Sequence, residues 1–313
     1  MSSDVRALVI ANPRSGGGRA ERAIDQVRGA LERRLGAVDL AITEHPMHAI
    51  DLARDAALQG RALLVAVGGD GTLHEVANGV LDAGGSAAVG YIGQGTGGDL
   101  RRALGIEHRL EAYIDAIASG RRRRIDAGKC RYRAIDGATR VRWFVNILSV
   151  GMGGLVDRYV SQTTKALGGR AAYFWASVKA LASCQRGKLR CEVALGGDHR
   201  GRRLDTFMLA ICNGSYFGSG MHVAPMAKLD DGRFEVISLG APNKLSFALS
   251  SRRIYAGKHL SSPGAEHFAC DRIALEIENE EARSVFLLDV DGEPLGGLPL
   301  EVELVPQALT LAT

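Results

Sequence analysis

VGGDGTLHEVANGV, residues 67–80, places glycines, an aspartate and a threonine between an apolar run and a helix-like pattern. Gly68, Gly69 and Gly71 leave peptide N–H groups uncovered where a buried strand is expected to end. The next helix is expected near Leu73, so its positive end points at the same place. Uncovered amides at a helix N-terminus favour a phosphate group.

Asp70 stands among these amides. Its carboxylate would repel a bare phosphate, which favours either a Mg²⁺ between the two or a proton-transfer role. Thr72 could cap the helix or bind a phosphate oxygen. The sequence G-G-D-G is also an ordinary turn, so this stretch alone does not decide between a turn and a binding loop.

Strands and helices alternate around this stretch. That alternation predicts a parallel sheet covered by helices on both faces, with ligands at the carboxyl ends of its strands. The expected strands are Val5–Ala11, Val38–Thr43, Ala62–Val67 and Ala87–Ile92, and the expected helices are Arg19–Leu35, Met47–Gln59 and Leu73–Leu81.

Two further glycine-rich segments fall at strand ends. ANPRSGGGRA, residues 11–20, follows the first strand, and GQGTGGDL, residues 93–100, follows the fourth. Three such loops at neighbouring strand ends favour one binding platform over three unrelated turns.

The second half of the chain is rich in strands. Consecutive strands favour an antiparallel sandwich-like domain. The expected strands are Ile125–Tyr132, Val141–Val150, Leu189–Leu195, Thr206–Cys212, Phe234–Leu239, Ile273–Ile277, Val285–Val290 and Leu300–Val305, with helices near Ala171–Ser183 and Lys244–Tyr255. We therefore expect an α/β domain over residues 1–125 and a β-rich domain over residues 126–313, whose last residues could pack back on the first. Asp126 and Asp136 are expected to be solvated.

Composition narrows the class of protein. The chain has 313 residues and a net charge of +4, with its basic residues in short runs such as Arg121–Arg124. No aromatic residues interleave these runs, so nucleic acid is not an expected partner. Solvated faces and contact with anionic lipid head groups both remain open. Five cysteines without a C-x-x-C pair, no signal peptide and no apolar stretch of membrane-spanning length predict a cytoplasmic protein that touches membranes only peripherally.

The glycine loops, together with LDVDGEPL at residues 288–295, resemble the diacylglycerol kinase family of lipid kinases, which includes sphingosine and ceramide kinases. The motifs NPRSGGG, VGGDGT, GTGGDL and D-G-E occur in the family's order over nearly the whole chain. G-G-D-G-T alone is shared with NAD kinases, whereas its combination with D-G-E is more specific. APMAKLDDGRFEVI, residues 224–237, is also similar to a family segment.

The resemblance implies an ATP- and Mg²⁺-dependent lipid kinase with its active site in a cleft between an α/β domain and a β-rich domain. It implies that Asp70 and Asp99 belong to a Mg²⁺–water network around the phosphates. It implies that Asp291, with Glu293 beside it, accepts the lipid hydroxyl proton, although the residues themselves also allow Asp70 as the base. The ATP-binding residues carried over by position are Asn12, Pro13, Arg14, Ser15, Gly16, Thr43, Gly68, Gly69, Asp70, Gly71, Thr72, Leu73, His74, Gly95, Thr96 and Asp99.

A further, structural Mg²⁺ is implied at Lys228, Asp231 and Arg233, with main-chain oxygen supplied by Lys228 and Arg233. The chain departs from the family at the third loop, where Gly98 stands for the usual asparagine and Leu100 for phenylalanine. The missing amide removes one contact to nucleotide or substrate.

Three other functions are compatible with single motifs of the sequence. An NAD kinase shares G-G-D-G-T, but Asp291-Gly292-Glu293 and the long β-rich half favour the lipid enzyme. A nucleotide-binding regulatory protein without phosphotransfer is made conceivable by Gly98. A dehydrogenase would need its G-x-G-x-x-G at the first strand rather than at residues 93–98. The acceptor, diacylglycerol-like or sphingoid-like, and a possible homodimer are left open by the sequence.

Overall fold

The computed structural model describes residues 6–95, 97–162 and 169–313, so Thr96 lies outside the described residues. The chain divides into two compact units, Met1–Ala127 together with Pro306–Thr313, and Gly128–Val305. It passes from the first unit to the second within β5 (Arg122–Ala134) and returns within β17 (Glu293–Ala312).

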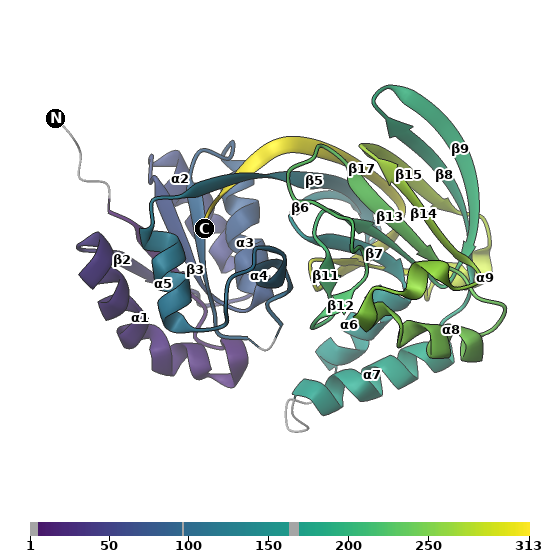
Figure 1. Cartoon of the computed structure of the whole chain (residues 1–313), viewed down its shortest axis with the longest axis horizontal. Helices are drawn as coiled ribbons and strands as arrows, with labels where there is room; N and C mark the ends of the chain where they lie inside the picture. Colours follow the sequence, from purple (N-terminus) through teal and green to yellow (C-terminus); the bar gives the residue numbers. More distant parts are fainter. Residues whose placement is uncertain (1–5, 96, 163–168) are drawn as a thin grey trace. The chain divides into compact units, whose positions relative to one another are not determined.

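The first unit is a parallel sheet between two layers of helices. Its strands lie in the order β2-β1-β3-β4, and the end of β17 adds a further parallel strand through Thr310 and Leu311. Helices α1 and α5 pack together on one face, and α2 and α3 pack together on the other (Figure 1). The elements are β1 (Leu8–Ala11), η1 (Ser15–Gly17), α1 (Arg19–Leu35), β2 (Asp39–Ile42), α2 (His48–Leu58), β3 (Leu63–Gly68), α3 (Asp70–Asp82), β4 (Ala88–Gly93), α4 (Asp99–Ala103) and α5 (Leu110–Ala118).

The apolar runs of β3 and β4 are buried along their whole length, as strands covered on both faces must be. The predicted α/β architecture of this half is confirmed. Helix α3 begins at Asp70, three residues before the predicted start, because the backbone turns directly from β3 into the helix. The short α4 and the longer α5 were not predicted.

The second unit is built mainly from antiparallel strands. The path β14-β13-β10-β7-β16-β17 forms its main sheet, and β15, β8, β9, β5 and β6 extend from β17. The remaining elements are β6 (Thr139–Phe144), β7 (Ile147–Gly151), α6 (Met152–Gln162), α7 (Gly169–Ser183), β8 (Gly187–Leu195), β9 (Asp198–Thr206), β10 (Met208–Cys212), β11 (Tyr216–Phe217), β12 (Met221–His222), β13 (Phe234–Leu239), α8 (Lys244–Ser251), η3 (Ile254–Ala256), η4 (His259–Ser261), β14 (Ala265–Cys270), β15 (Arg272–Ile277), α9 (Glu280–Arg283) and β16 (Leu287–Val290).

Two apolar cores hold this unit. One is enclosed by the strands and includes Phe144, Leu288 and Val290. The other lies on the opposite face, where residues of α6, α7 and α8 cover the sheet. The β-rich, sandwich-like second half is therefore confirmed. Successive side chains along a strand such as β10 point alternately into the two cores.

Three expectations about this half were wrong in detail. The single strand predicted over residues 141–150 is two strands, β6 and β7, interrupted at Val145 and Asn146. Strand β9 was missed because its DHRGRRLDT sequence is polar on both faces. Asp126 is fully buried rather than solvated, because its Oδ1 accepts a hydrogen bond from the N–H of Gln307 (2.8 Å). Gln307 is far from Asp126 in the sequence.

Within the described ranges, no helix is long and apolar enough to cross a membrane.

Candidate functional site

The three glycine-rich loops of the first unit meet at the carboxyl ends of β1, β3 and β4. The Gln94 N–H donates to the Gly68 carbonyl (2.7 Å), which joins the second and third loops. A Cβ added to Gly69 would lie 3.3 Å from Ser15 Oγ, and one added to Gly95 would lie 3.2 Å from Gly69 Cα. The predicted loops therefore form one surface of closely packed backbone, as a phosphate platform requires.

The first loop turns sharply after β1. Asn12 Oδ1 accepts the Arg14 N–H (3.1 Å), and Gly16 has a φ of +61°. Pro13 and Arg14 reach the surface of this loop, with Arg14 exposed. Thr43, at the end of β2, is 9% exposed and its N–H donates to the Ala11 carbonyl (2.9 Å), so its backbone continues the sheet beside this loop.

Asp70 lies at the first position of α3, where its negative charge is favourable to the helix dipole. Its Oδ2 accepts the Gly98 N–H (2.7 Å), and its carboxylate also hydrogen-bonds the Tyr91 hydroxyl. Burial, with the nearby charge of Asp70 as the next cause, raises the pKa of Tyr91 well above 10, so the hydroxyl stays protonated and donates. Asp70 thus joins the second loop to the third.

The third loop is shaped around this carboxylate. A Cβ added to Gly97 would lie 2.2 Å from Asp70 Oδ2, so no other residue fits there without displacing Asp70. Gly98 has a φ of +74°, and a Cβ there would lie 2.9 Å from Arg101 Nε. Asparagine, the usual family residue here, adopts this left-handed conformation more readily than most residues. Glycine at this position therefore keeps the same backbone conformation and lacks only the side chain.

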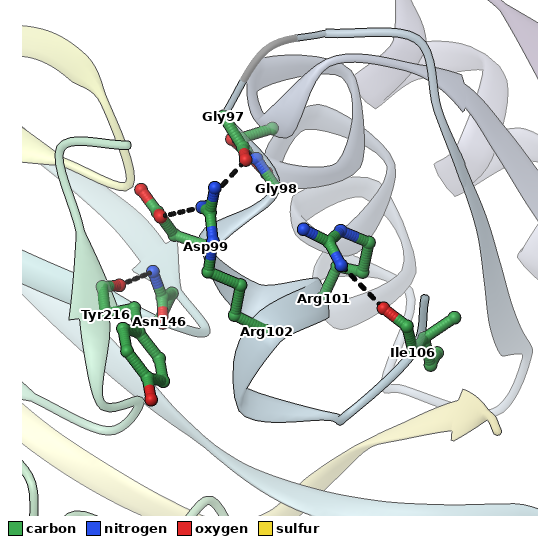
Figure 2. A network of polar contacts seen from close by, with 9 residues as sticks. Gly97, Gly98, Asp99, Arg101, Arg102, Ile106, Asn146 and Tyr216 are labelled. Atoms are coloured by element: carbon green, nitrogen blue, oxygen red, sulfur yellow. Dashed lines mark hydrogen bonds and ion pairs between the residues drawn. The ribbon is translucent and has the colours of Figure 1, made fainter. Parts of the chain in front are cut away.

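Asp99 follows in α4 and is 7% exposed. Figure 2 shows Arg102 donating to Asp99 Oδ1 (2.6 Å) and to the Gly97 carbonyl (2.8 Å), while Arg101 donates to the Ile106 carbonyl (2.6 Å). The arginine therefore fixes the carboxylate and the loop backbone together.

The side chains after Asp70 turn inward. Leu73 and His74 are buried at 3% and 1% exposure, and Asn78 Nδ2 donates to the His74 carbonyl (2.9 Å). Thr72 is 4% exposed, and a Cβ added to Gly68 would lie only 2.3 Å from Thr72 Oγ1. Gly71 lies in the first turn of α3 and has no side chain to cover its backbone. These residues offer a ligand backbone N–H groups rather than side chains.

In the second unit, Asp291 and Gly292 form the two-residue turn between β16 and β17. Val290 pairs with Glu293, and both turn residues have positive φ, +52° and +93°, as the type I′ hairpin turn requires. Glu293 begins β17 and is half-buried.

The Asp291 carboxylate is held by three backbone N–H groups. Oδ2 accepts from Val145 (2.9 Å), and Oδ1 accepts from Asn146 (3.0 Å) and Ile147 (2.9 Å). This contact explains the break between β6 and β7, because these amides serve the carboxylate instead of a neighbouring strand. Asn146 Nδ2 in turn donates to the Tyr216 carbonyl (2.9 Å; Figure 2).

The predicted structural Mg²⁺ site lies in the loop before β13. Arg233 Nε lies 3.2 Å from Asp231 Oδ2 and 3.2 Å from Glu235 Oε1, so its guanidinium neutralises both carboxylates. Lys228 lies in the same loop, directly before the turn at residues 229–230. In the part of the chain that the structure describes, no group of three or more His, Cys, Asp or Glu residues could hold a metal. A cation at Asp231 would therefore compete with Arg233, and this site stays a prediction.

Several residues that contact the predicted ones were not predicted from the sequence. Tyr91 could have been noticed as a hydroxyl within an otherwise apolar strand. Arg102 lies three residues after Asp99, at the spacing of a helical ion pair. Asp289 interrupts an apolar strand two residues before Asp291. Its partner Asp157 carries no signal in the sequence, because only folding brings α6 to β16.

Comparisons with known proteins cover almost the whole chain. A family model described as the diacylglycerol kinase catalytic domain matches residues 6–130, and one described as the YegS C-terminal NAD kinase beta sandwich-like domain matches residues 146–313. The chain is 28% identical over 298 residues to a diacylglycerol kinase of Bacillus subtilis (strain 168), covering 95% of this chain and 92% of that protein. It is 29% identical to a diacylglycerol kinase of Staphylococcus aureus (strain MRSA252), covering 94% and 88%.

Solved structures agree on the fold. A crystal structure of a diacylglycerol kinase from Bacillus anthracis str. Sterne superposes with a TM-score of 0.72 at 19% identity, covering 100% of this chain and 98% of that one. The yeast NADH kinase complexed with NADH superposes with a TM-score of 0.51 at 13% identity, covering 99% and 83%.

Proposed function

The chain belongs to the diacylglycerol kinase family of lipid kinases, and we propose that it transfers the γ-phosphoryl group of ATP, with Mg²⁺, to the hydroxyl of a diacylglycerol-like lipid. The observation that carries the proposal is the meeting of three glycine loops around Asp70, in a chain that also carries the D-G-E turn. Phosphoryl transfer requires positioned phosphates, neutralised charge and a base for the acceptor hydroxyl, and these residues supply such groups.

The first unit would hold the nucleotide. The backbone N–H groups of Gly69, Gly71 and Thr72 lie at the positive end of α3, which favours phosphate oxygens. Ser15 Oγ lies beside Gly69 and could donate to the same phosphates. The buried side chains of Leu73 and His74 would support this surface from below rather than contact ATP.

Asp70 and Asp99 have the donor chemistry that Mg²⁺ prefers, since this ion is usually held by one or two carboxylates together with water and phosphate oxygens. When bound, the ion would neutralise charge on the phosphates. The hydrogen bonds of Asp70 to Gly98 and Tyr91, and of Asp99 to Arg102, orient these carboxylates before any ligand arrives.

The second unit would receive the acceptor proton. Asp291 is the proposed base, and its three amide contacts fix the direction of its remaining lone pairs. The same contacts occupy three of the acceptor positions of this carboxylate, so Asp70 remains the competing candidate. Glu293, next along the hairpin, would add negative charge beside the acceptor hydroxyl.

Labelled ATP and thin-layer chromatography of lipid products test the proposal. Mixed micelles would present diacylglycerol, sphingosine, ceramide and a phosphatidyl alcohol, with NAD as a soluble acceptor. We expect a labelled phospholipid from diacylglycerol that is lost when Mg²⁺ is chelated. Phosphorylated NAD would favour a nucleotide kinase, and ATP binding without any labelled product would favour a regulatory protein.

Peripheral contact with an anionic membrane is part of the proposal. Arg121, Arg122 and Arg124 are exposed, and such residues contribute about 1 kcal/mol each near an anionic surface. A homodimer and a cytoplasmic location also remain proposals, the first testable by light scattering and the second by cell fractionation.

A further inference from the structure

Two carboxyl groups from different elements lie hydrogen-bonded to each other beside the D-G-E turn. Asp157 comes from α6 and Asp289 from β16. Asp289 is 4% exposed and Asp157 is half-buried. Two carboxylates cannot share a hydrogen bond unless one carries a proton, so this pair holds at least one proton when it is formed.

Two glycines of α6 allow the carboxyl groups to meet. A Cβ added to Gly153 would lie 2.2 Å from Ser149 Oγ, and one added to Gly154 would lie 2.4 Å from the Leu287 carbonyl. The first turn of α6 therefore packs directly on the Ser149 side chain of β7 and on the backbone at Leu287 of β16. Asp157 follows these glycines by four and three residues, on the same face of the helix, which places it over Asp289.

Asp289 also holds the turn itself. Its Oδ1 accepts the Gly292 N–H (2.8 Å), and its Oδ2 lies 3.4 Å from the Ser149 hydroxyl. Asp291, on the other side of the turn, is held by the amides of residues 145–147. The turn is thus held at Gly292 by the Asp289 carboxylate and at Asp291 by the amides of residues 145–147.

The surroundings of the pair favour its protonated form. Desolvation raises the pKa of Asp157 from 3.8 to about 7 and raises that of Asp289 well above its ordinary value. The charged groups that face the pair are Asp291 on the turn and Glu293 on β17, both acidic. On α6 itself Arg158 is exposed, and on α7 Lys179 lies over the Tyr159 ring at 4.3 Å.

We propose that Asp157 and Asp289 are positioning residues that share one proton and thereby hold the Asp291-Gly292-Glu293 turn in its working geometry. This inference rests on the proposed function for its catalytic consequence, but not for the shared proton itself. Loss of the proton places two negative charges side by side, next to Asp291 and Glu293. Their repulsion loosens the contact with Gly292 and shifts the turn away from its working geometry.

The direction of the pH effect follows from the raised pKa values. Between about pH 4 and pH 7 the folded protein keeps a proton that the unfolded chain has lost, so the free energy of unfolding falls as pH rises through this range. The contribution of the Asp157 carboxyl is fully present below pH 4 and is lost as pH rises through about 7, and the raised pKa of Asp289 adds a loss in the same direction. A single retained proton changes the ratio of folded to unfolded protein by at most about tenfold per pH unit.

Asp157→Asn tests this inference, because asparagine keeps a donor toward Asp289 but cannot ionise. Asp289→Asn is the reciprocal variant, and Glu281→Gln, an exposed carboxyl on α9, is the matched control. Thermal unfolding midpoints would be measured from pH 4.5 to 8.5. Infrared spectra would show the band of a protonated carboxyl, and phosphotransfer rates would be measured over the same pH range.

Wild type and Glu281→Gln should lose stability with rising pH, and Asp157→Asn should lose clearly less. A protonated-carboxyl band should be present in wild type at pH 6 and absent when both carboxyls are replaced, in the double variant Asp157→Asn with Asp289→Asn. Where wild-type phosphotransfer declines above pH 7, the decline should be weaker in Asp157→Asn. Equal pH slopes in all variants, or no such band in wild type, would overturn the shared proton; the wild-type spectrum decides this even if the asparagine variants fail to fold.

The outcomes also separate this inference from the proposed function. If the slopes and the band behave as expected but no lipid is phosphorylated, the proton pair stands and the lipid kinase reaction does not. If lipid is phosphorylated with the same pH profile in wild type and Asp157→Asn, the positioning role is wrong.

Discussion

Replacing Asp291 by asparagine separates the anchoring of its carboxylate by three amides from its proposed role as the base. The three amides that it accepts belong to residues at most 9% exposed, namely Val145, Asn146 and Ile147. The asparagine oxygen can still accept from Asn146 and Ile147. Its amide nitrogen then faces the Val145 N–H, so one charge-assisted bond is lost and two donors oppose each other.

A hydrogen bond to a charged group contributes about 1.5–3 kcal/mol, and we expect Asp291→Asn to cost about that much. For a unit of this size each kcal/mol lowers the unfolding midpoint by about 2–4 °C, so a decrease of roughly 3–12 °C is expected. Asp291→Ala exposes all three amides and should cost more. Glu293→Gln, on the same hairpin, is the control and should change the midpoint little.

The base role predicts a separate, kinetic loss. Single-turnover rates on the folded variant should fall about 10²- to 10⁴-fold, while Mg-ATP affinity measured by calorimetry changes little. An unchanged unfolding midpoint would refute the anchoring argument. If Asp291→Asn lost nucleotide affinity while Asp70→Asn lost only rate, the base would be Asp70 instead.

The other predictions concern the first unit and the membrane. Asp70→Asn should reduce phosphotransfer at least about 10²-fold with retained circular dichroism, and activity within a few-fold of wild type would exclude a catalytic role. Gly97→Ala places a methyl group 2.2 Å from Asp70 Oδ2, so activity should fall at least about tenfold and stability by about 1–3 kcal/mol, whereas an unchanged unfolding curve would contradict the close packing. Binding to anionic vesicles should weaken with salt, and replacing Arg121–Arg124 by glutamine should reduce it further. Equal sedimentation with neutral vesicles would count against electrostatic docking.

Two patterns in the sequence, the apolar runs and the glycines that follow them, correctly predicted local structure. The apolar runs before Gly68 and before Gly93 became fully buried parallel strands, because continuous apolar sequence satisfies a strand covered on both faces. The glycines after them became closely packed loops, since a side chain at Gly97 would displace Asp70. Such constraints are local, so the sequence displays them directly.

The partners of the polar groups were decided by tertiary structure alone. Asp291 meets the amides of residues 145–147, and Asp157 meets Asp289, across more than a hundred residues of chain. Neither contact leaves a periodic pattern, because a hydrogen bond requires only that two groups meet after folding. The sequence by itself therefore determined the order of the elements, the glycine platform and the D-G-E turn. The directions of the carboxylates, the break between β6 and β7, and the shared proton depend on which distant segments pack together.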